Sequence, residues 1–368
     1  MNYAAFADRS YITRLCEEIH TRLLDCDEKR TFIFLHRYFQ TFIQQERFEE
    51  LEMYLDIIEV YPFATYADRV LTFTGYIKGL LRKSEGELKE AAYWFRLTLA
   101  KQKQLQRLGL NNIAVDCYKQ LGNLEFGRKA YKYAFEHYQD AINLLSLDKD
   151  SEYLLAKLMY KHALCQYYLK NYQLALEYLD KVIPLAKDTS NSLLLLNAFV
   201  MKAVLLSDHF MKYEESNQFL NCAFDLAKRN RYDEAIHKIW RIMANNFYRL
   251  KQYVLAEHAL RSAMNCCVKT GDLERQVEVE MLQAKIWMAQ GQQQRAKQLL
   301  EDIKVKTADV PEFTMTYLSC LELLEQLEED EVLRVQYVEK ALQLAAANNN
   351  YCKTKKFEKI LVEIGKNR

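Results

Sequence analysis

Histidine and cysteine are the side chains in this sequence that could hold a metal or attack a substrate, but their spacing favours neither chemistry. Seven histidines and nine cysteines are scattered over 368 residues, without a C-x-x-C pair or an H-E-x-x-H motif. His162 and Cys165 lie three residues apart, yet no further ligands stand nearby. We therefore predict no catalytic residue, no metal and no cofactor. The cysteines, Cys26 among them, are interpreted as buried apolar residues of a reducing compartment.

A second set of side chains could bind a ligand without transforming it. Lysine and arginine attract carboxylates, and an asparagine amide can pair with the backbone of an extended peptide. The candidate peptide-binding residues are Lys119, Asn123, Lys157, Tyr160, Lys161, Lys202, Lys238, Arg241, Asn245 and Arg249. Solvated charges on helix surfaces would give the same pattern, and for any single residue the two interpretations are equally well supported.

The candidate residues are identified by their positions in a repeat of about forty residues. Small residues recur at Ala134, Ala175, Ser216 and Ala256, in steps of 41, 41 and 40 residues, and the register extends over eight units. Twelve residues before each such position a second small residue recurs, at Gly79, Gly122, Ala163, Ala244 and Ala284, with departures at Phe39, Val204 and Glu322. Such a unit is typical of a helical hairpin in which small residues allow close packing. The candidate residues should then lie on the first helices of the hairpins.

Composition supports an all-α fold. The chain has only 9 Gly and 3 Pro, too few for the turns of a sandwich, a barrel or an α/β sheet. We predict a right-handed superhelix of about eight hairpins with a capping helix at each end. The predicted divisions are an N-terminal region with an atypical hairpin (residues 1–62), a repeat array (63–347) and a C-terminal capping helix (351–366). The first capping helix is expected at Ala4–Leu24.

The repeat resembles the tetratricopeptide (TPR) repeat. Leu121-Gly122, Tyr131, Ala134, Tyr138 and Ala141 match its small-and-aromatic signature, and the resemblance covers residues 32 to 345. The steps are longer than the usual ~34 residues of that repeat.

The longer step resembles one group of TPR proteins, the peptide-pheromone receptors of Gram-positive bacteria (Rap, NprR and PlcR types). Lys170-Asn171-Tyr172 and Lys251-Gln252-Tyr253 are similar to hairpin turns of that family. The resemblance implies a short peptide bound in a concave groove by asparagines, and the matching positions here are Asn123 and Asn245.

The resemblance has two branches with different N-termini. The regulators carry a DNA-binding domain, for which Met1–Leu24 is too short, so we expect no direct binding of nucleic acid by this chain. The phosphatases use a glutamine in an N-terminal helical bundle. Gln40, Gln44 and Gln45 are present, but their surroundings do not match that segment clearly, and we do not predict an enzyme.

The function predicted from the sequence is a cytoplasmic sensor. It would bind a short signalling peptide and change its conformation, or self-associate as a homodimer, to control a protein partner such as a transcription or response regulator. The net charge of +1 gives no general attraction for nucleic acid or membrane, and no apolar run is long enough to span a bilayer. Two alternatives stay open: a TPR scaffold for protein assembly and a response-regulator phosphatase.

Overall fold

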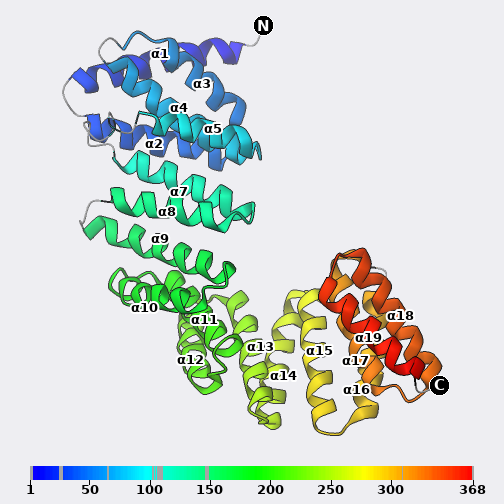
Figure 1. Cartoon of the computed structure of the whole chain (residues 1–368). Helices are drawn as coiled ribbons and strands as arrows, with labels where there is room; N and C mark the ends of the chain where they lie inside the picture. Colours follow the sequence, from blue (N-terminus) through cyan, green and yellow to red (C-terminus); the bar gives the residue numbers. More distant parts are fainter. Residues whose placement is uncertain are drawn as a thin grey trace. The chain divides into compact units, whose positions relative to one another are not determined.

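The computed structural model describes residues 3–24, 28–63, 66–101, 103, 105, 111–145, 149–308 and 310–366. Over these residues the chain forms eighteen α-helices, a 3-10 helix and no strand (Figure 1). The predicted all-α fold of TPR-type hairpins is confirmed. Among the described residues, no helix is long and apolar enough to cross a membrane.

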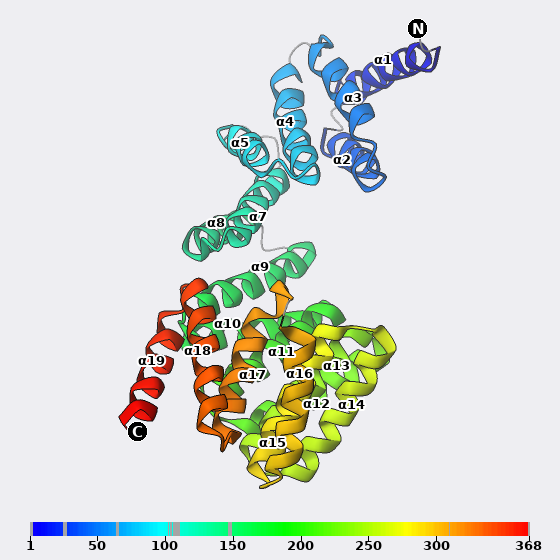
Figure 2. The ribbon, with the colours of Figure 1, turned by 90° about the vertical axis from the view of Figure 1, so that its right-hand side faces the viewer.

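The chain divides into two compact units, Met1–Leu194 and Leu195–Arg368. The helices of unit 1 are α1 (Tyr3–Leu24), α2 (Glu28–Gln44), α3 (Phe48–Val60), α4 (Ala67–Ser84), α5 (Leu88–Leu99), α7 (Asn111–Gly127), α8 (Tyr131–Leu144), α9 (Lys149–Tyr168) and α10 (Tyr172–Asp188). In Figures 1 and 2, α4, α5, α7 and α8 follow one another in chain order. The sequence predicts a division into residues 1–62, 63–347 and 351–366 according to the role of each segment. The two compact units do not test that division, so it stays a prediction.

Most of α11 belongs to unit 2, although this helix begins three residues before Leu195. Its helices are α11 (Ser192–Asp208), α12 (Tyr213–Asn230), α13 (Asp233–Arg249), α14 (Tyr253–Thr270), α15 (Leu273–Ala289), α16 (Gln293–Thr307), the 3-10 helix η2 (Pro311–Phe313), α17 (Thr314–Leu327), α18 (Glu331–Ala347) and α19 (Tyr351–Lys366). Eight hairpins result over the described residues. We call the first helix of each hairpin the A helix (α2, α4, α7, α9, α11, α13, α15 and α17) and the second the B helix.

The first small position of each repeat brings the A and B helices together. Gly122 of α7 lies against the ring of Tyr138 in α8, and Gly79 of α4 lies against the ring of Phe95 in α5. A β-carbon would stand 2.5 Å from the Tyr138 ring and 2.6 Å from the Phe95 ring. The interpretation of these glycines as close-packing residues is confirmed.

The second small position is buried on the B helix. Ala134, Ala175, Ser216 and Ala256 are fully buried. The exception in residue type, Ser216, keeps its hydroxyl satisfied because it donates to the carbonyl oxygen of Ala203 in α11, with an O–O distance of 2.8 Å. The Ser216 hydroxyl is thus buried at a close-packing position with its hydrogen bond formed.

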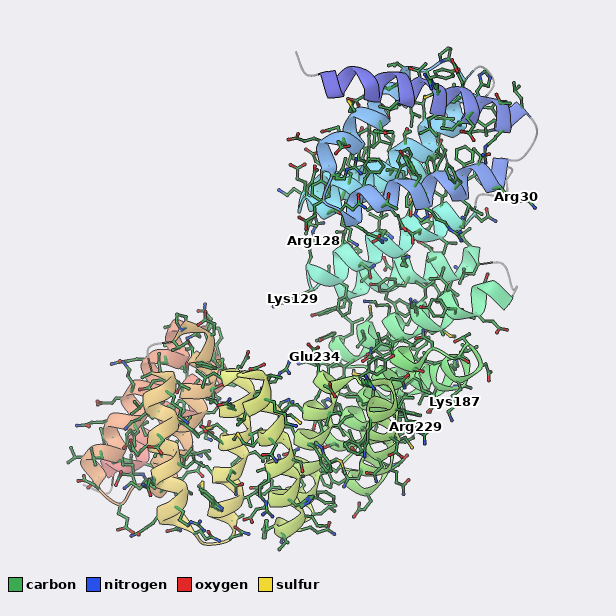
Figure 3. The ribbon with its side chains drawn as sticks, turned by 180° about the vertical axis from the view of Figure 1, so that it is seen from behind. Arg30, Arg128, Lys129, Lys187, Arg229 and Glu234 are labelled. Carbon is green, nitrogen blue, oxygen red and sulfur yellow. The ribbon has the colours of Figure 1, made fainter. Side chains whose placement is uncertain are left out.

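The four consecutive A–B turns from α7–α8 to α13–α14 each contain one residue in the left-handed region. Lys129, Lys170, Met211 and Lys251 have φ between 54° and 64°, at the same place in successive turns. In the α7–α8 turn, the amide after Lys129 donates to the Glu125 carbonyl with an N–O distance of 2.9 Å, which closes the end of the A helix. Figure 3 labels Lys129 at the edge of the ribbon. These lysines adopt a conformation that favours glycine.

Both predicted capping helices are present. α1 buries Ile12, Cys16 and Leu23, and α19 buries Phe357 and Ile364. The interpretation of the cysteines as uniformly buried is wrong in part, because outward positions of helices also carry them. The buried ones are Cys16, Cys117, Cys165, Cys267 and Cys320, whereas Cys222 and Cys352 are exposed and Cys266 is half-buried. Cys26 lies outside the described residues.

Candidate functional site

Several neighbouring A helices contact each other through polar side chains. Counting the first small residue of a repeat as position eight, Tyr76 and Arg241 stand at position five. The Tyr76 hydroxyl donates to Asp116 at position two of the next A helix, with an O–O distance of 2.6 Å. Arg241 pairs with Glu278, again at position two of the next A helix, with an N–O distance of 3.3 Å. We call the surface formed by positions two, five, six, nine and thirteen the A-helix face.

In unit 1 this face carries a chain of hydrogen bonds that extends to α2. The Tyr76 hydroxyl lies 3.1 Å from His36 Nε2, and the Gln40 amide nitrogen lies 3.2 Å from the same atom. Three successive A helices, α2, α4 and α7, are therefore connected through His36, Tyr76 and Asp116. The burial of Tyr76 makes each of these bonds costly to lose.

The carboxylate of Asp116 is the centre of this chain. It forms an ion pair with Lys119 and accepts a hydrogen bond from the Gln120 amide at 3.2 Å. Burial alone would raise the pKa of Asp116, but the Lys119 ammonium and the hydrogen bonds outweigh burial and lower it. Lys83 of α4 then donates to Gln120 Oε1 at 2.7 Å.

Lysine side chains lie beside this chain of hydrogen bonds. Desolvation lowers the pKa of Lys83, and the nearby Lys119 and Lys161 lower it further, although Asp116 opposes them. Desolvation also lowers the pKa of Lys161, whose ammonium lies 5.5 Å from the centre of the Phe126 ring.

The remaining candidates of unit 1 take several roles. Asn123 accepts a hydrogen bond from the Tyr138 hydroxyl at 2.9 Å, so its oxygen is already used within the hairpin. Lys157 is exposed, with its ammonium 4.1 Å from the centre of the Tyr153 ring. Tyr160 is half-buried, and desolvation raises its pKa to about 12.

Unit 2 holds the other five candidates. Lys202 lies over the Phe219 ring at 4.3 Å, and Arg241 is paired with Glu278. Asn245 is half-buried, whereas Lys238 and Arg249 are exposed. Among the residues that the structure describes, Lys238, Asn245 and Arg249 have neither an ion pair nor a side-chain hydrogen bond, so their donors can bind a ligand.

The two asparagines that the sequence treats as equivalent differ in the structure. The amide oxygen of Asn123 accepts a hydrogen bond from Tyr138, whereas within the described part of the chain Asn245 keeps both its donor and its acceptor unused. The adjacent Asn246 is fully buried and donates to Ser216 Oγ at 2.9 Å and to Asn217 Oδ1 at 2.8 Å. It also accepts a 2.6 Å hydrogen bond from Ser207. Asn246 is thus a structural residue, and Asn245 is the better peptide-binding candidate.

Several residues of the A-helix face were missed from the sequence. Asp116 and Glu278 stand at position two, Tyr76 at position five and Lys285 at position nine. Applying the same register to the remaining units would have found Tyr76, Glu278 and Lys285, whereas Asp116 lies in the same unit as Lys119 and Asn123 and was passed over because only cations, amides and one tyrosine were selected.

His162 is a core residue. It is fully buried, and its ring stacks on Phe135 with a centroid distance of 4.2 Å. Burial lowers its pKa to about 4. Within the described ranges, no group of three histidine, cysteine or acidic side chains is placed to hold a metal ion.

Comparisons with known proteins support the fold. No protein-family model matches the sequence, and no curated protein matches it. Among solved structures, the apo form of RapI is similar, with a TM-score of 0.68 and 14% identity, over 90% of this chain and 96% of that chain.

Two further structures share the fold. The Rap conjugation gene regulator of plasmid pLS20, in complex with the Phr* peptide, has a TM-score of 0.52 and 15% identity, over 89% of this chain and 87% of that chain. Aspartyl phosphate phosphatase F from Bacillus subtilis has a TM-score of 0.56 and 14% identity, over 98% of this chain and 91% of that chain. The resemblance to Rap-type receptors is confirmed for the fold.

Proposed function

We propose that this chain is a cytoplasmic sensor that binds a short linear signalling peptide on its A-helix face. Binding changes its conformation or self-association and thereby controls a protein partner. The observation that carries the proposal is the set of available donors on unit 2: Lys238, Asn245 and Arg249 lie on one side of α13 and, among the described residues, form neither an ion pair nor a side-chain hydrogen bond, although the Arg249 guanidinium lies 6.0 Å from the centre of the Tyr248 ring. An asparagine amide flanked by cations suits a peptide backbone beside an acidic group.

Similarity to the pLS20 regulator supports the same function, because that protein is in complex with the Phr* peptide. Conformational control follows from the repeat architecture. Each hairpin packs mainly on its neighbours, so a peptide that touches several A helices favours the arrangement in which it makes more contacts.

The proposal is tested with a library of random heptapeptides and the full chain. Peptides retained by the protein are identified by mass spectrometry, resynthesised with a fluorophore and titrated by fluorescence polarisation. Asn245→Ala should weaken binding by about 1–3 kcal/mol, since a hydrogen bond at a half-buried site is lost. Gln294→Ala, on the exposed side of α16, is the matched control and should bind normally. Recovery of no preferred peptide would contradict the function.

The scaffold alternative predicts a different response. Small-angle scattering of the chain with and without a recovered peptide should change if the chain is a sensor, whereas a scaffold need not change. If the scattering curves coincide and the oligomeric state is also unaltered, the scaffold function is favoured.

The phosphatase alternative gains support from the similarity to aspartyl phosphate phosphatase F. Gln44 and Gln45 are exposed at the end of α2, where a partner could reach them. Turnover of a phosphorylated response regulator, compared between the wild type and Gln44→Ala/Gln45→Ala, tests it. Dephosphorylation that depends on these glutamines would replace the prediction of a non-enzyme.

A further inference from the structure

Three aromatic rings from three helices of unit 1 meet near the end of α9. Tyr168 of α9 stacks on Tyr131 of α8, with 4.6 Å between the ring centroids and 10° between the ring planes. Phe126 of α7 meets both tyrosines edge to face, at centroid distances of 5.2 Å to Tyr131 and 5.6 Å to Tyr168. We call these three residues the aromatic platform. Its helices α7, α8 and α9 lie next to one another in Figure 1.

Tyr168 is the exposed member of the aromatic platform. Tyr131 covers one face of its ring, and the ring of Tyr167 approaches it edge to face with a centroid distance of 5.3 Å. Nevertheless, 48% of the surface of Tyr168 is exposed, whereas Phe126 and Tyr131 are half-buried. Tyr168 stands at position thirteen of its repeat and so belongs to the A-helix face. A ligand on this face can therefore contact the Tyr168 ring.

A cation lies beside the aromatic platform. The ammonium of Lys161, at position six of the same A helix, is 5.5 Å from the centre of the Phe126 ring. The ring centre of Tyr168 lies 5.6 Å from that same point, so a charge and an exposed ring flank Phe126. Among the described residues, Lys161 forms no ion pair and no side-chain hydrogen bond. A ring attracts a cation but has no net charge, so the charge of Lys161 is not neutralised.

The surroundings of Lys161 favour a bound anion. Its side chain is half-buried, and desolvation by the neighbouring helices lowers its pKa, although the nearby Cys165 opposes this effect. An ion pair with a carboxylate replaces the hydration that the ammonium has lost. Lys157, one helical turn earlier, is exposed and lies 4.1 Å from the centre of the Tyr153 ring. It adds a second positive charge to the same side of α9.

This inference rests on the proposed function. We propose that the aromatic platform and Lys161 form a subsite for an aromatic residue at the C-terminus of the bound peptide. The ring of that residue packs on the exposed part of Tyr168, and its terminal carboxylate pairs with Lys161. Aromatic rings attract one another in offset-stacked and edge-to-face arrangements, and an ammonium is a strong partner for a carboxylate.

The two halves of the subsite together select a terminal residue. In a C-terminal Phe, Tyr or Trp, one α-carbon carries both the ring and the carboxylate, so the two groups are held a short distance apart. An aromatic residue inside a peptide has the ring without that carboxylate. A terminal aliphatic residue has the carboxylate without the ring. Only a terminal aromatic residue meets both the exposed ring of Tyr168 and the ammonium of Lys161.

The first test uses the full wild-type chain and random heptapeptides with free C-terminal carboxylates. We expect aromatic residues to be enriched at the last position of the recovered peptides. Replacing the last residue by leucine should weaken binding about fivefold, and so should conversion of the terminal carboxylate to an amide. If peptides are recovered without an aromatic preference at the last position, or if both changes leave the affinity unaltered, the subsite is overturned while the proposed function stands. If no peptide is recovered, the proposed function fails and the subsite fails with it.

The second test asks whether each peptide change depends on its own partner in the protein. On Tyr168→Leu, the change to leucine should no longer weaken binding, whereas the amide still should. On Lys161→Gln, the amide should have no effect, whereas the change to leucine still should. Tyr133→Leu, at a residue that is 61% exposed on α8, and Lys132→Gln, beside it on the same helix, should respond as the wild type does. Each response is a ratio of affinities within one variant, so partial misfolding does not alter it. Ratios equal to those of the wild type in Tyr168→Leu and Lys161→Gln would overturn the subsite.

Discussion

Gly122 of α7 and Tyr138 of α8 are in such close contact that a β-carbon at position 122 would stand 2.5 Å from Tyr138 Cε1. The two residues are sixteen apart, and the same spacing recurs in other hairpins. Gly79 faces the aromatic Phe95, whereas alanine is combined with leucine in the pairs Ala163/Leu179, Ala244/Leu260 and Ala284/Leu300. A glycine thus faces an aromatic ring and an alanine faces the smaller leucine, so the summed side-chain volume of the two facing residues is similar in these hairpins.

Gly122→Ala should lower the free energy of unfolding by about 1–3 kcal/mol, because the ring of Tyr138 must move. Gly127→Ala is the control, since a β-carbon there meets nothing within 4 Å, and it should be neutral or stabilising. Urea denaturation measures both. The double variant Gly122→Ala/Tyr138→Leu should lose less than the sum of its two single variants; simple additivity would contradict this packing argument.

The left-handed turn residues predict a stabilising substitution. Lys251 has a φ of 60°, a conformation that costs a residue with a β-carbon about 1 kcal/mol and costs glycine little. Lys251→Gly should therefore raise the melting temperature. Lys228→Gly, within α12, should lower it, because glycine weakens a helix interior. Calorimetry distinguishes the two, and equal effects would argue against strain at position 251.

The hydrogen-bond chain of unit 1 predicts that removing a single hydroxyl lowers the free energy of unfolding. Tyr76→Phe removes the donor to Asp116 and a neighbour of His36, and should destabilise the protein by about 1–3 kcal/mol. Tyr93→Phe removes a hydroxyl from a ring that is 60% exposed and should have little effect. Chemical denaturation of both variants provides the measurement. A Tyr76→Phe protein as stable as the wild type would show that water replaces this bond.

His162 predicts a dependence of stability on pH. Its pKa lies near 6.5 in the unfolded chain and is lowered to about 4 by burial in the fold. Between these values the unfolded state binds more protons, so the free energy of unfolding falls as the pH falls through this window. The loss reaches about 3 kcal/mol.

His162→Leu should flatten the pH profile of stability between pH 6.5 and 4, measured by denaturation at several pH values. His258→Gln replaces an exposed histidine and should leave the profile unchanged. A profile that is the same in the wild type and in His162→Leu would mean that the imidazole is hydrated when it becomes charged.

The sequence by itself determined the helical hairpins and their register. Periodic small residues and apolar faces report how each helix packs on the next one along the chain, and this local packing is repeated every forty residues. The contact of Gly122 with the B helix, the burial of Ala134 and the terminal helices could all be predicted. Ten ligand-binding candidates were placed on the A helices, as the structure has them.

Only the tertiary structure decided which polar side chains are still free to bind a ligand. The amide oxygen of Asn123 accepts a hydrogen bond from Tyr138, whereas Asn245 forms no side-chain hydrogen bond with any described residue and its neighbour Asn246 is buried in a network. The hydrogen bond from Tyr76 of α4 to Asp116 of α7 joins residues forty positions apart, and no short-range pattern predicts it. Charges and hydrogen bonds depend on distances between helices that are remote in the sequence, whereas helix formation depends on residues three and four apart.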